Sequence, residues 1–178
     1  PYLDKVSLLV VPDDSTRLAA IRTNKGDWVT AVQLEDGRGL VKANPALRFT
    51  KYKPTGGGIA LKIEDKALPF KDVRVRHALM MATDFDGITR DYYGGDAENF
   101  VWPTPPEYYW LFIPLKDMPK SVQDLYTYNP AKAKQLLAEA GYPNGFKTSM
   151  LVRSTTGVVD RAAVIKDMWA KAGIDVNL

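Results

Sequence analysis

The sequence predicts an α/β fold, because patterns typical of helices and of strands alternate along its second half. Residues 72–83 and 129–141 carry apolar side chains at helical spacing behind a capping residue. A third helical pattern, residues 158–171, lies between two short β-rich segments. The short connections imply that the last two strands are parallel and joined by a right-handed crossover.

The chain begins with a predicted strand and a short helix. Residues 6–11 form a β-rich apolar run that ends at Pro12, which is typical of a strand. Asp13 and its neighbours then offer N-cap side chains for a helix. Asn24 can adopt the left-handed conformation that closes this helix.

The next segment predicts further extended structure. Residues 28–34 alternate weakly and predict a strand, followed by a turn at Gly37 and Gly39. From residue 47 to residue 63 we expect extended segments with a hairpin turn at residues 56–58. The three glycines of that turn lack the Lys-Ser/Thr sequence or following helix that a phosphate-binding loop needs.

The second half begins with the clearest helix. Asp72 is its expected N-cap, and Val75, Ala78, Leu79 and Ala82 form one apolar stripe. Residues 84–93 predict a second, short helix that ends at two glycines. Residues 96–121 predict an irregular loop, because they contain five prolines.

The remaining elements follow at short intervals. Asn129 and Pro130 begin a helix that ends at Gly141, since asparagine is a good N-cap and proline is favoured at the first helical position. Residues 147–153 predict a strand, the third helix follows, and residues 174–178 alternate as a final strand.

Composition excludes several kinds of chemistry. The 178 residues contain no cysteine and a single histidine, which argues against most zinc sites, iron–sulfur clusters, disulfides and hydrolytic triads. His77 lies one position off the apolar stripe of its helix, without a neighbouring carboxylate in the sequence. Asp84 and Asp86 fit helix capping better than a catalytic pair. We therefore expect no catalytic residue, no metal site and no cofactor.

The charge pattern does not indicate nucleic-acid binding. The net charge is only +3. Between residues 37 and 63, six cations occur without an acid, but only Phe49 and Tyr52 are interleaved with them as possible stacking partners. The cations are Arg38, Lys42, Arg48, Lys51, Lys53 and Lys62. No apolar run approaches the roughly 18 residues that span a bilayer.

A cluster of aromatic residues is the strongest sign of a binding site. Six aromatics occur within 13 residues of the proline-rich loop: Phe100, Trp102, Tyr108, Tyr109, Trp110 and Phe112. Aromatics on a stiff loop supply large contact area with few rotors, which suits a ligand-binding wall. The alternative is that they pin the loop onto its own domain. Our candidate ligand-binding residues are Trp102, Tyr108, Tyr109 and Trp110.

Four stretches of the sequence resemble a known family. Residues 2–6, 69–79, 128–142 and 171–176 are similar, in this order, to the middle of the extracytoplasmic solute-binding proteins of peptide and nickel ABC transporters, solute-binding protein family 5. These stretches are helix starts, apolar stripes and caps, so they indicate a fold rather than a ligand.

The resemblance implies a periplasmic-binding-protein-like type II lobe, a mixed sheet flanked by helices, plus a strip of the neighbouring lobe. Residues 1–66 would form the end of the first lobe and the crossover segment, and residues 67–178 most of the second lobe. We also expect a piece of a longer protein, since the chain starts at Pro1 and stops within an alternating pattern.

The function implied by the resemblance is that of the substrate-binding component of an ABC importer, not an enzyme. It would be a monomer located outside the cytoplasm, in the periplasm or lipid-anchored at the cell surface. It would capture a di- or oligopeptide or a similar small solute and deliver it to the permease subunits, without a cofactor or nucleic acid. Peptide, nickel complex and sugar remain open as ligands.

Two alternatives belong to other functional classes. The same fold could serve as a sensor or interaction module that docks a partner through residues 97–113. A hydrolase that uses Asp84 or Asp86 is the more remote alternative.

Overall fold

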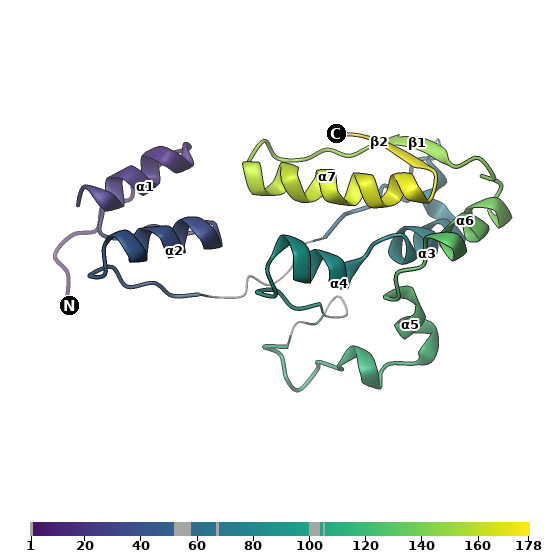
Figure 1. Cartoon of the computed structure of the whole chain (residues 1–178), viewed down its shortest axis with the longest axis horizontal. Coiled ribbons are helices and arrows are strands. Elements are labelled where there is room, and N and C mark those ends of the chain that lie inside the picture. The colour runs from purple at the N-terminus through teal and green to yellow at the C-terminus, as the bar shows by residue number, and fades with distance from the viewer. Residues whose placement is uncertain (1, 52–57, 67, 100–103, 105) are drawn as a thin grey trace. The chain divides into compact units, whose positions relative to one another are not determined.

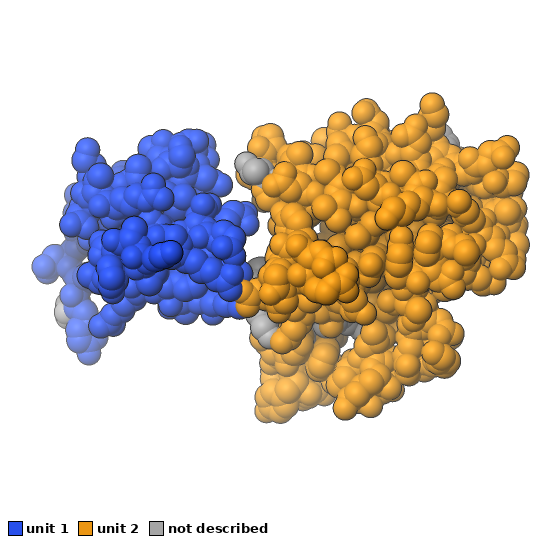
Figure 2. Space-filling model, viewed as in Figure 1, with its two compact units in different colours: residues 1–52 blue, residues 53–178 orange. Residues whose placement is uncertain are grey.

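The computed structural model describes residues 2–51, 58–66, 68–99, 104 and 106–178 (Figure 1). The chain divides into two compact units, residues 1–52 and residues 53–178, which Figure 2 shows in separate colours. Among the described residues, the first unit contains two helices, and the second contains the remaining helices and a parallel sheet of two strands.

The first helix of the chain, α1 (Asp14–Arg22), agrees with the sequence prediction. The Asp13 side chain caps it by accepting a hydrogen bond of 2.7 Å from the backbone N–H of Thr16. Hydrogen bonds from the hydroxyls of Ser15 and Thr16, and from this N–H, lower the pKa of Asp13 to about 2. Asn24 has the expected left-handed backbone, with φ of 54°.

The predicted strand at residues 28–34 and the turn at Gly37 and Gly39 are wrong. The structure instead has a helix, α2 (Leu34–Ala43), that contains both glycines. Glu35 and Asp36 lie in its first turn, where negative charge complements the helix dipole. Gly37 is buried, and a β-carbon there would lie 2.6 Å from the ring of Phe49. This glycine therefore allows close packing and does not form a turn.

The extended segments predicted in the first third are not paired strands. Residues 6–11 have no regular structure and are mostly exposed. Residues 58–63 also form no strand, and Leu61 among them packs against the core of the second unit. The predicted turn at residues 56–58 falls largely outside the described residues.

The helices predicted in the second unit are confirmed. A 3-10 turn, η1 (Pro69–Lys71), leads to Asp72, the N-cap of the next helix. The predicted short helix consists of a helical turn that continues directly into a π turn. The elements are α3 (Val73–Met81), α4 (Phe85–Gly87), the π turn η2 (Ile88–Tyr92), α6 (Pro130–Glu139) and α7 (Thr156–Lys171).

The proline-rich segment contains structure that the sequence did not indicate. Its last part forms a 3-10 turn, η3 (Leu115–Asp117), and a short helix, α5 (Lys120–Leu125). Pro119 is the N-cap of α5, which has no side-chain cap. Proline is tolerated at the start of a helix, since the N–H that it lacks would have no partner there.

The sheet confirms the predicted parallel pair. Strand β1 (Phe146–Ser149) lies beside β2 (Ile174–Asn177), with Phe146 opposite Ile174 and Ser149 opposite Asn177. β1 begins one residue before the predicted strand and ends four residues earlier than predicted. Helix α7 connects the two strands and runs beside them (Figure 1).

The core of the second unit combines both strands with three helices. Helices α3 and α6 pack side by side, and α7 contributes Trp169 and Ala172. The Trp169 indole donates a hydrogen bond of 2.9 Å to the buried Thr83 hydroxyl, which donates 2.8 Å to the carbonyl of Leu79. The buried members are Phe70, Val75, Ala78, Leu79, Ala82, Ala133, Leu137, Trp169, Ala172, Ile174 and Val176.

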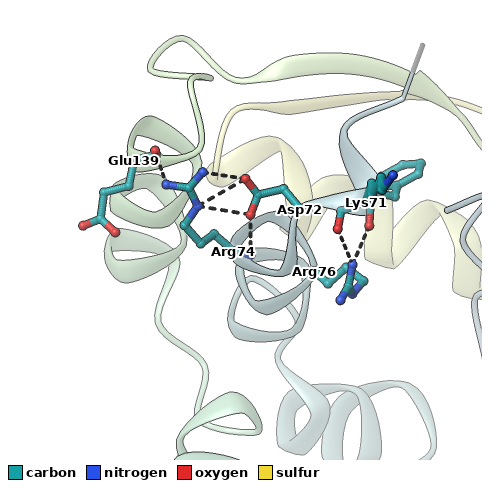
Figure 3. Close-up of polar contacts among 6 residues, drawn as sticks. Lys71, Asp72, Arg74, Arg76 and Glu139 are labelled. Carbon is teal, nitrogen blue, oxygen red and sulfur yellow. Dashed lines mark hydrogen bonds and ion pairs between the residues drawn. The ribbon is translucent and has the colours of Figure 1, made fainter. Parts of the chain in front are cut away.

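Two arginines tie the start of α3 to its surroundings (Figure 3). Arg74 forms an ion pair with Asp72 at 2.6 Å. It also donates a hydrogen bond of 2.5 Å to the carbonyl of Glu139, the last residue of α6. Arg76 donates to the carbonyls of Phe70 and Lys71, both at 2.8 Å. These bonds satisfy carbonyls at a helix end and at a 3-10 turn.

The Asp72 carboxylate should make stability pH-dependent. Hydrogen bonds from the Arg74 side chain and backbone lower the pKa of Asp72 from 3.8 to about 2. A lowered pKa means that the carboxylate stabilises the fold above pH 3.8, and that this contribution disappears as the pH falls through about 2. We expect Asp72→Asn to reduce the dependence of the unfolding free energy on pH in this window.

Urea denaturation at a series of pH values measures this effect. Asp167→Asn is the control, since the Asp167 side chain is exposed on α7 and makes no hydrogen bond or ion pair with any described residue. Equal pH dependence in wild type and Asp72→Asn would contradict the prediction.

Candidate functional site

Tyr108, Tyr109 and Trp110 lie on an exposed turn of the proline-rich segment. The turn is closed by backbone hydrogen bonds from Leu111 and Phe112 to the Tyr108 carbonyl, at 2.8 and 2.9 Å. The exposed fractions are 48% for Tyr108, 80% for Tyr109 and 64% for Trp110. The turn thus holds three large rings where they are open to solvent.

The ring of Trp110 contacts the other two. Trp110 packs edge-to-face against Tyr109, with centroids 5.0 Å apart, and against Tyr108, at 5.8 Å. Such pairs are stabilising in themselves and reduce the rotational freedom of each ring. The structure therefore brings together three of the four candidate ligand-binding residues. Trp102, the fourth, lies outside the described residues, as does Phe100.

The exposed surface extends beyond the aromatic rings. Leu111 and Ile113 are also largely exposed, while Phe112 between them is partly buried. We did not predict a role for these two aliphatic residues. The signal that could have found them is the continuous run of apolar residues at 108–113, which has neither helical nor strand periodicity. We call residues 108–113 the aromatic turn.

A separate pocket of about 370 Å³ lies among α4, η3 and α5. Its lining does not include the aromatic turn, and it mixes charged, amide and aromatic side chains. The lining residues are Asp84, Asp86, Leu115, Lys116, Lys120, Gln123, Tyr126, Thr127 and Tyr128.

The two carboxylates of this pocket hold local structure. Asp84 caps α4 by accepting a hydrogen bond of 2.8 Å from the backbone N–H of Gly87, as the sequence predicted. Asp86 accepts a hydrogen bond of 3.0 Å from the side-chain amide of Asn99. Lys120 on the opposite side forms an ion pair with Asp124 at 2.8 Å. The two carboxylates are therefore engaged in capping and loop contacts, and Lys120 in an ion pair along α5.

The other groups considered for chemistry do not form a reactive cluster. His77 is half-buried on α3, and its imidazole makes no hydrogen bond with any described residue. Within the described ranges, no three His, Asp or Glu side chains converge on a position for a metal ion. In the same residues, no helix is both long and apolar enough to cross a membrane.

The exposed aromatic turn on this α/β core offers a large contact surface with polar tips, which suits ligand binding. The family model of the bacterial extracellular solute-binding proteins, family 5 middle region, matches residues 1–178. The chain belongs to this family, and the predicted resemblance is confirmed.

Relatives of known description agree with this assignment. Heme-binding protein A of Haemophilus influenzae is 33% identical over 180 residues, covering 98% of this chain and 31% of the relative. Oligopeptide-binding protein AppA of Bacillus subtilis is 30% identical over 190 residues, covering 99% and 33%. The chain thus spans about a third of the length of these relatives.

Solved structures confirm the fold class, a type II periplasmic-binding-protein lobe. The ABC transporter-associated periplasmic binding protein DppA from Helicobacter pylori, in complex with the peptide STSA, matches with a TM-score of 0.69 and 31% identity. The matched region covers 94% of this chain and 31% of DppA. MoaA of A. tumefaciens R10, in complex with mannopinic acid, matches with a TM-score of 0.66 and 26% identity, covering 94% and 32%.

Proposed function

We propose that this chain is part of the substrate-binding component of an ABC importer. The observation that carries the proposal is the match of the family model to every residue of the chain. Such a component works by ligand-stabilised closure of two lobes, a shift between conformations that needs no catalytic group. The protein acts outside the cytoplasm as a monomer, is not an enzyme, and delivers its solute to membrane permease subunits.

In our proposal, the boundary between the two lobes along the sequence lies near residue 66. Residues 1–66 belong to the end of the first lobe and the crossover, and residues 67–178 to the second lobe. The separation of the chain into compact units 1–52 and 53–178 supports a division in this region.

The proposed ligand is a di- or oligopeptide or a solute of similar size. Support comes from the names of the relatives, which include an oligopeptide-binding and a glutathione-binding protein, and from the peptide bound to DppA. Heme and mannopinic acid are also bound within this group, so the scaffold accepts different chemistries.

Ligand-dependent thermal stabilisation of the full-length protein tests this function. A panel should include di- and tetrapeptides, glutathione, heme, a sugar acid conjugate and a nickel complex. Binding to the folded state raises the melting temperature, because it stabilises that state by an amount that grows with the logarithm of the ligand concentration divided by Kd. We expect stabilisation by at least one peptide. A folded protein that no member of the panel stabilises would contradict the proposal.

The proposed ligand-facing wall consists of the aromatic turn together with Trp102, and its contact residues are Trp102, Tyr108, Tyr109 and Trp110. The rings of Tyr108, Tyr109 and Trp110 are exposed, and Trp110 packs against the other two on a short turn, which limits the entropy lost on binding. Tyrosine and tryptophan also offer a polar tip beside a large apolar face.

We expect Trp110→Ala to weaken solute binding by the full-length protein about tenfold or more, as for a central aromatic contact. Isothermal titration calorimetry with the peptide identified above measures the affinity. Trp28→Ala is the matched control, because Trp28 is 79% exposed but lies outside the aromatic turn. Equal affinities for the two variants would remove the aromatic turn from the binding site without affecting the proposed function.

A further inference from the structure

Gln123 bridges two carbonyls in the segment that follows the aromatic turn. This half-buried residue lies on α5, and its side-chain amide donates a hydrogen bond of 2.7 Å to the carbonyl of Met118. It donates a second, of 3.2 Å, to the carbonyl of Lys116. Neither carbonyl accepts a backbone hydrogen bond from any described residue. Both N–H donors of the Gln123 side chain therefore serve this segment.

The segment held by these bonds is short and stiff. Residues 114–119 connect the aromatic turn to α5, and a proline stands at each end. Pro114 precedes η3 with φ of −57°, and Pro119 precedes α5 with φ of −53°. Because the proline ring fixes φ, few torsions remain free between the aromatic turn and α5. A displacement of η3 relative to α5 would therefore move the aromatic turn with it.

Helix α5 is itself attached to the rest of the second unit. It packs against α3. The ring of its C-cap residue, Tyr126, lies against the ring of Phe85 on α4, with centroids 5.3 Å apart. A few residues later, the backbone N–H of Asn129 donates a hydrogen bond of 2.7 Å to the carbonyl of Met81, the last residue of α3. Gln123 thus reaches the loop from an anchored helix.

The aromatic turn lacks such an attachment of its own. Its backbone hydrogen bonds, from Leu111 and Phe112 to Tyr108, are internal. Among the described residues, no hydrogen bond joins residues 108–113 to any other part of the chain. The direction in which its rings point therefore depends on the chain that carries the turn, and Gln123 holds the part that follows it.

We propose that Gln123 is a positioning residue of the solute-binding site, which holds the aromatic turn in place through η3. The proposal rests on the function proposed above, in which the aromatic turn faces the solute. A turn that is held in advance loses less conformational entropy when a ligand binds, so a loosened turn binds more weakly with the same contact residues. Gln123 acts through the loop backbone and not through contact with the solute.

Hydrogen–deuterium exchange of the ligand-free full-length protein tests the positioning role without a solute. We expect Gln123→Ala to increase the exchange rates of the Leu111 and Phe112 amides about fivefold or more, because these amides are protected only while the turn is ordered. Gln135→Ala is the matched control. The Gln135 side chain also makes two hydrogen bonds, but on the exposed face of α6. Equal exchange in wild type and Gln123→Ala would overturn the proposal.

Calorimetric titration with the peptide identified in the ligand panel measures the consequence for binding. We expect Gln123→Ala to weaken the affinity about three- to tenfold, with a less favourable binding entropy, and Gln135→Ala to leave the affinity unchanged. Gln123→Glu separates hydrogen-bond donation from packing, because a carboxylate keeps the shape of the side chain but only accepts. It should weaken the affinity at pH 7 at least as much as alanine does.

The outcomes distinguish this proposal from the proposed function. Failure of the proposed function appears in wild type, as a folded protein that binds no solute. Failure of the positioning role appears only in the variants, as wild-type affinity in Gln123→Ala or in Gln123→Glu. A lower melting temperature with unchanged affinity would give Gln123 a purely structural role and would also overturn the proposal.

Discussion

Replacing Gly145 with alanine is expected to lower the free energy of unfolding by about 3 kcal/mol or more, enough to prevent folding of the second unit in a marginally stable protein. Gly145 has φ of +74°, a conformation that residues with a β-carbon rarely adopt. The added β-carbon would also overlap the carbonyl oxygen of Gly173 and lie 2.6 Å from its carbonyl carbon.

The clash has no easy relief, because both atoms belong to the backbone. Gly145 precedes Phe146 at the start of β1, and Gly173 precedes Ile174 at the start of β2. Since Phe146 pairs with Ile174, the sheet register itself brings the two turns together. Moving one turn away would therefore disturb the first pair of the sheet.

Gly141→Ala is the control for this experiment. Gly141 also has a positive φ, of +95°, but a β-carbon there would meet no atom within 4 Å. We expect this variant to lose only about 1–2 kcal/mol from backbone strain. Chemical denaturation of both full-length variants, followed by circular dichroism, measures the difference. Equal losses of unfolding free energy in the two variants would show that the contact with Gly173 does not contribute to the destabilisation.

Trp169→Ala is expected to cost about 3–5 kcal/mol, the range for removing a large buried aromatic side chain. Trp169 is only 4% exposed and lies in the core with residues from both strands and from α3. The change leaves a cavity, and it also leaves the buried Thr83 hydroxyl without the indole donor. Trp28→Ala is the control and should cost little, since Trp28 is largely exposed.

Further variants separate the two contributions of Trp169. Trp169→Phe keeps most of the ring volume but removes the hydrogen-bond donor, and Thr83→Val removes the acceptor. In a double-variant cycle we expect a coupling of about 1 kcal/mol, typical of a buried hydrogen bond. Additive effects of the two changes would mean that packing alone accounts for the loss.

The helix starts of the second unit could be predicted from sequence because the signals are local. Asp72 and Asn129 each accept a backbone N–H from within the first turn of the helix that follows, at 2.8 and 2.9 Å. Gly141 and Gly173 end helices with positive φ, as their positions after apolar stripes predicted. Each of these features depends on residues fewer than five positions apart.

Helix α2 could not be predicted in this way. Two glycines within its sequence indicated a turn, since glycine lowers helix propensity. Glycine at position 37 leaves room for the ring of Phe49, which packs closely against it. This contact joins residues that are 12 positions apart, so a local pattern does not indicate it. The charges at the helix ends, Glu35 and Asp36 at one and Lys42 at the other, favour a helix, but this local signal is too weak to offset two glycines.

The candidate binding surface shows the same limit. Trp110 and Trp169 are the same residue type, yet one is 64% exposed and the other 4% exposed. Helical spacing predicted that Trp169 is buried, because α7 has an apolar stripe that must face the core. The aromatic turn has no periodicity, so only the folded structure shows which of its rings lie open to solvent.

The sequence by itself determined the α/β class, the capped helices of the second unit, the parallel final strands and the family. These depend on spacings and caps that a few neighbouring residues define. Only the tertiary structure decided that Arg74 reaches the carbonyl of Glu139, that Gly145 meets Gly173, and that Phe49 lies against Gly37. Such contacts join residues far apart in the chain, and their energies depend on distances that exist only after the elements have packed.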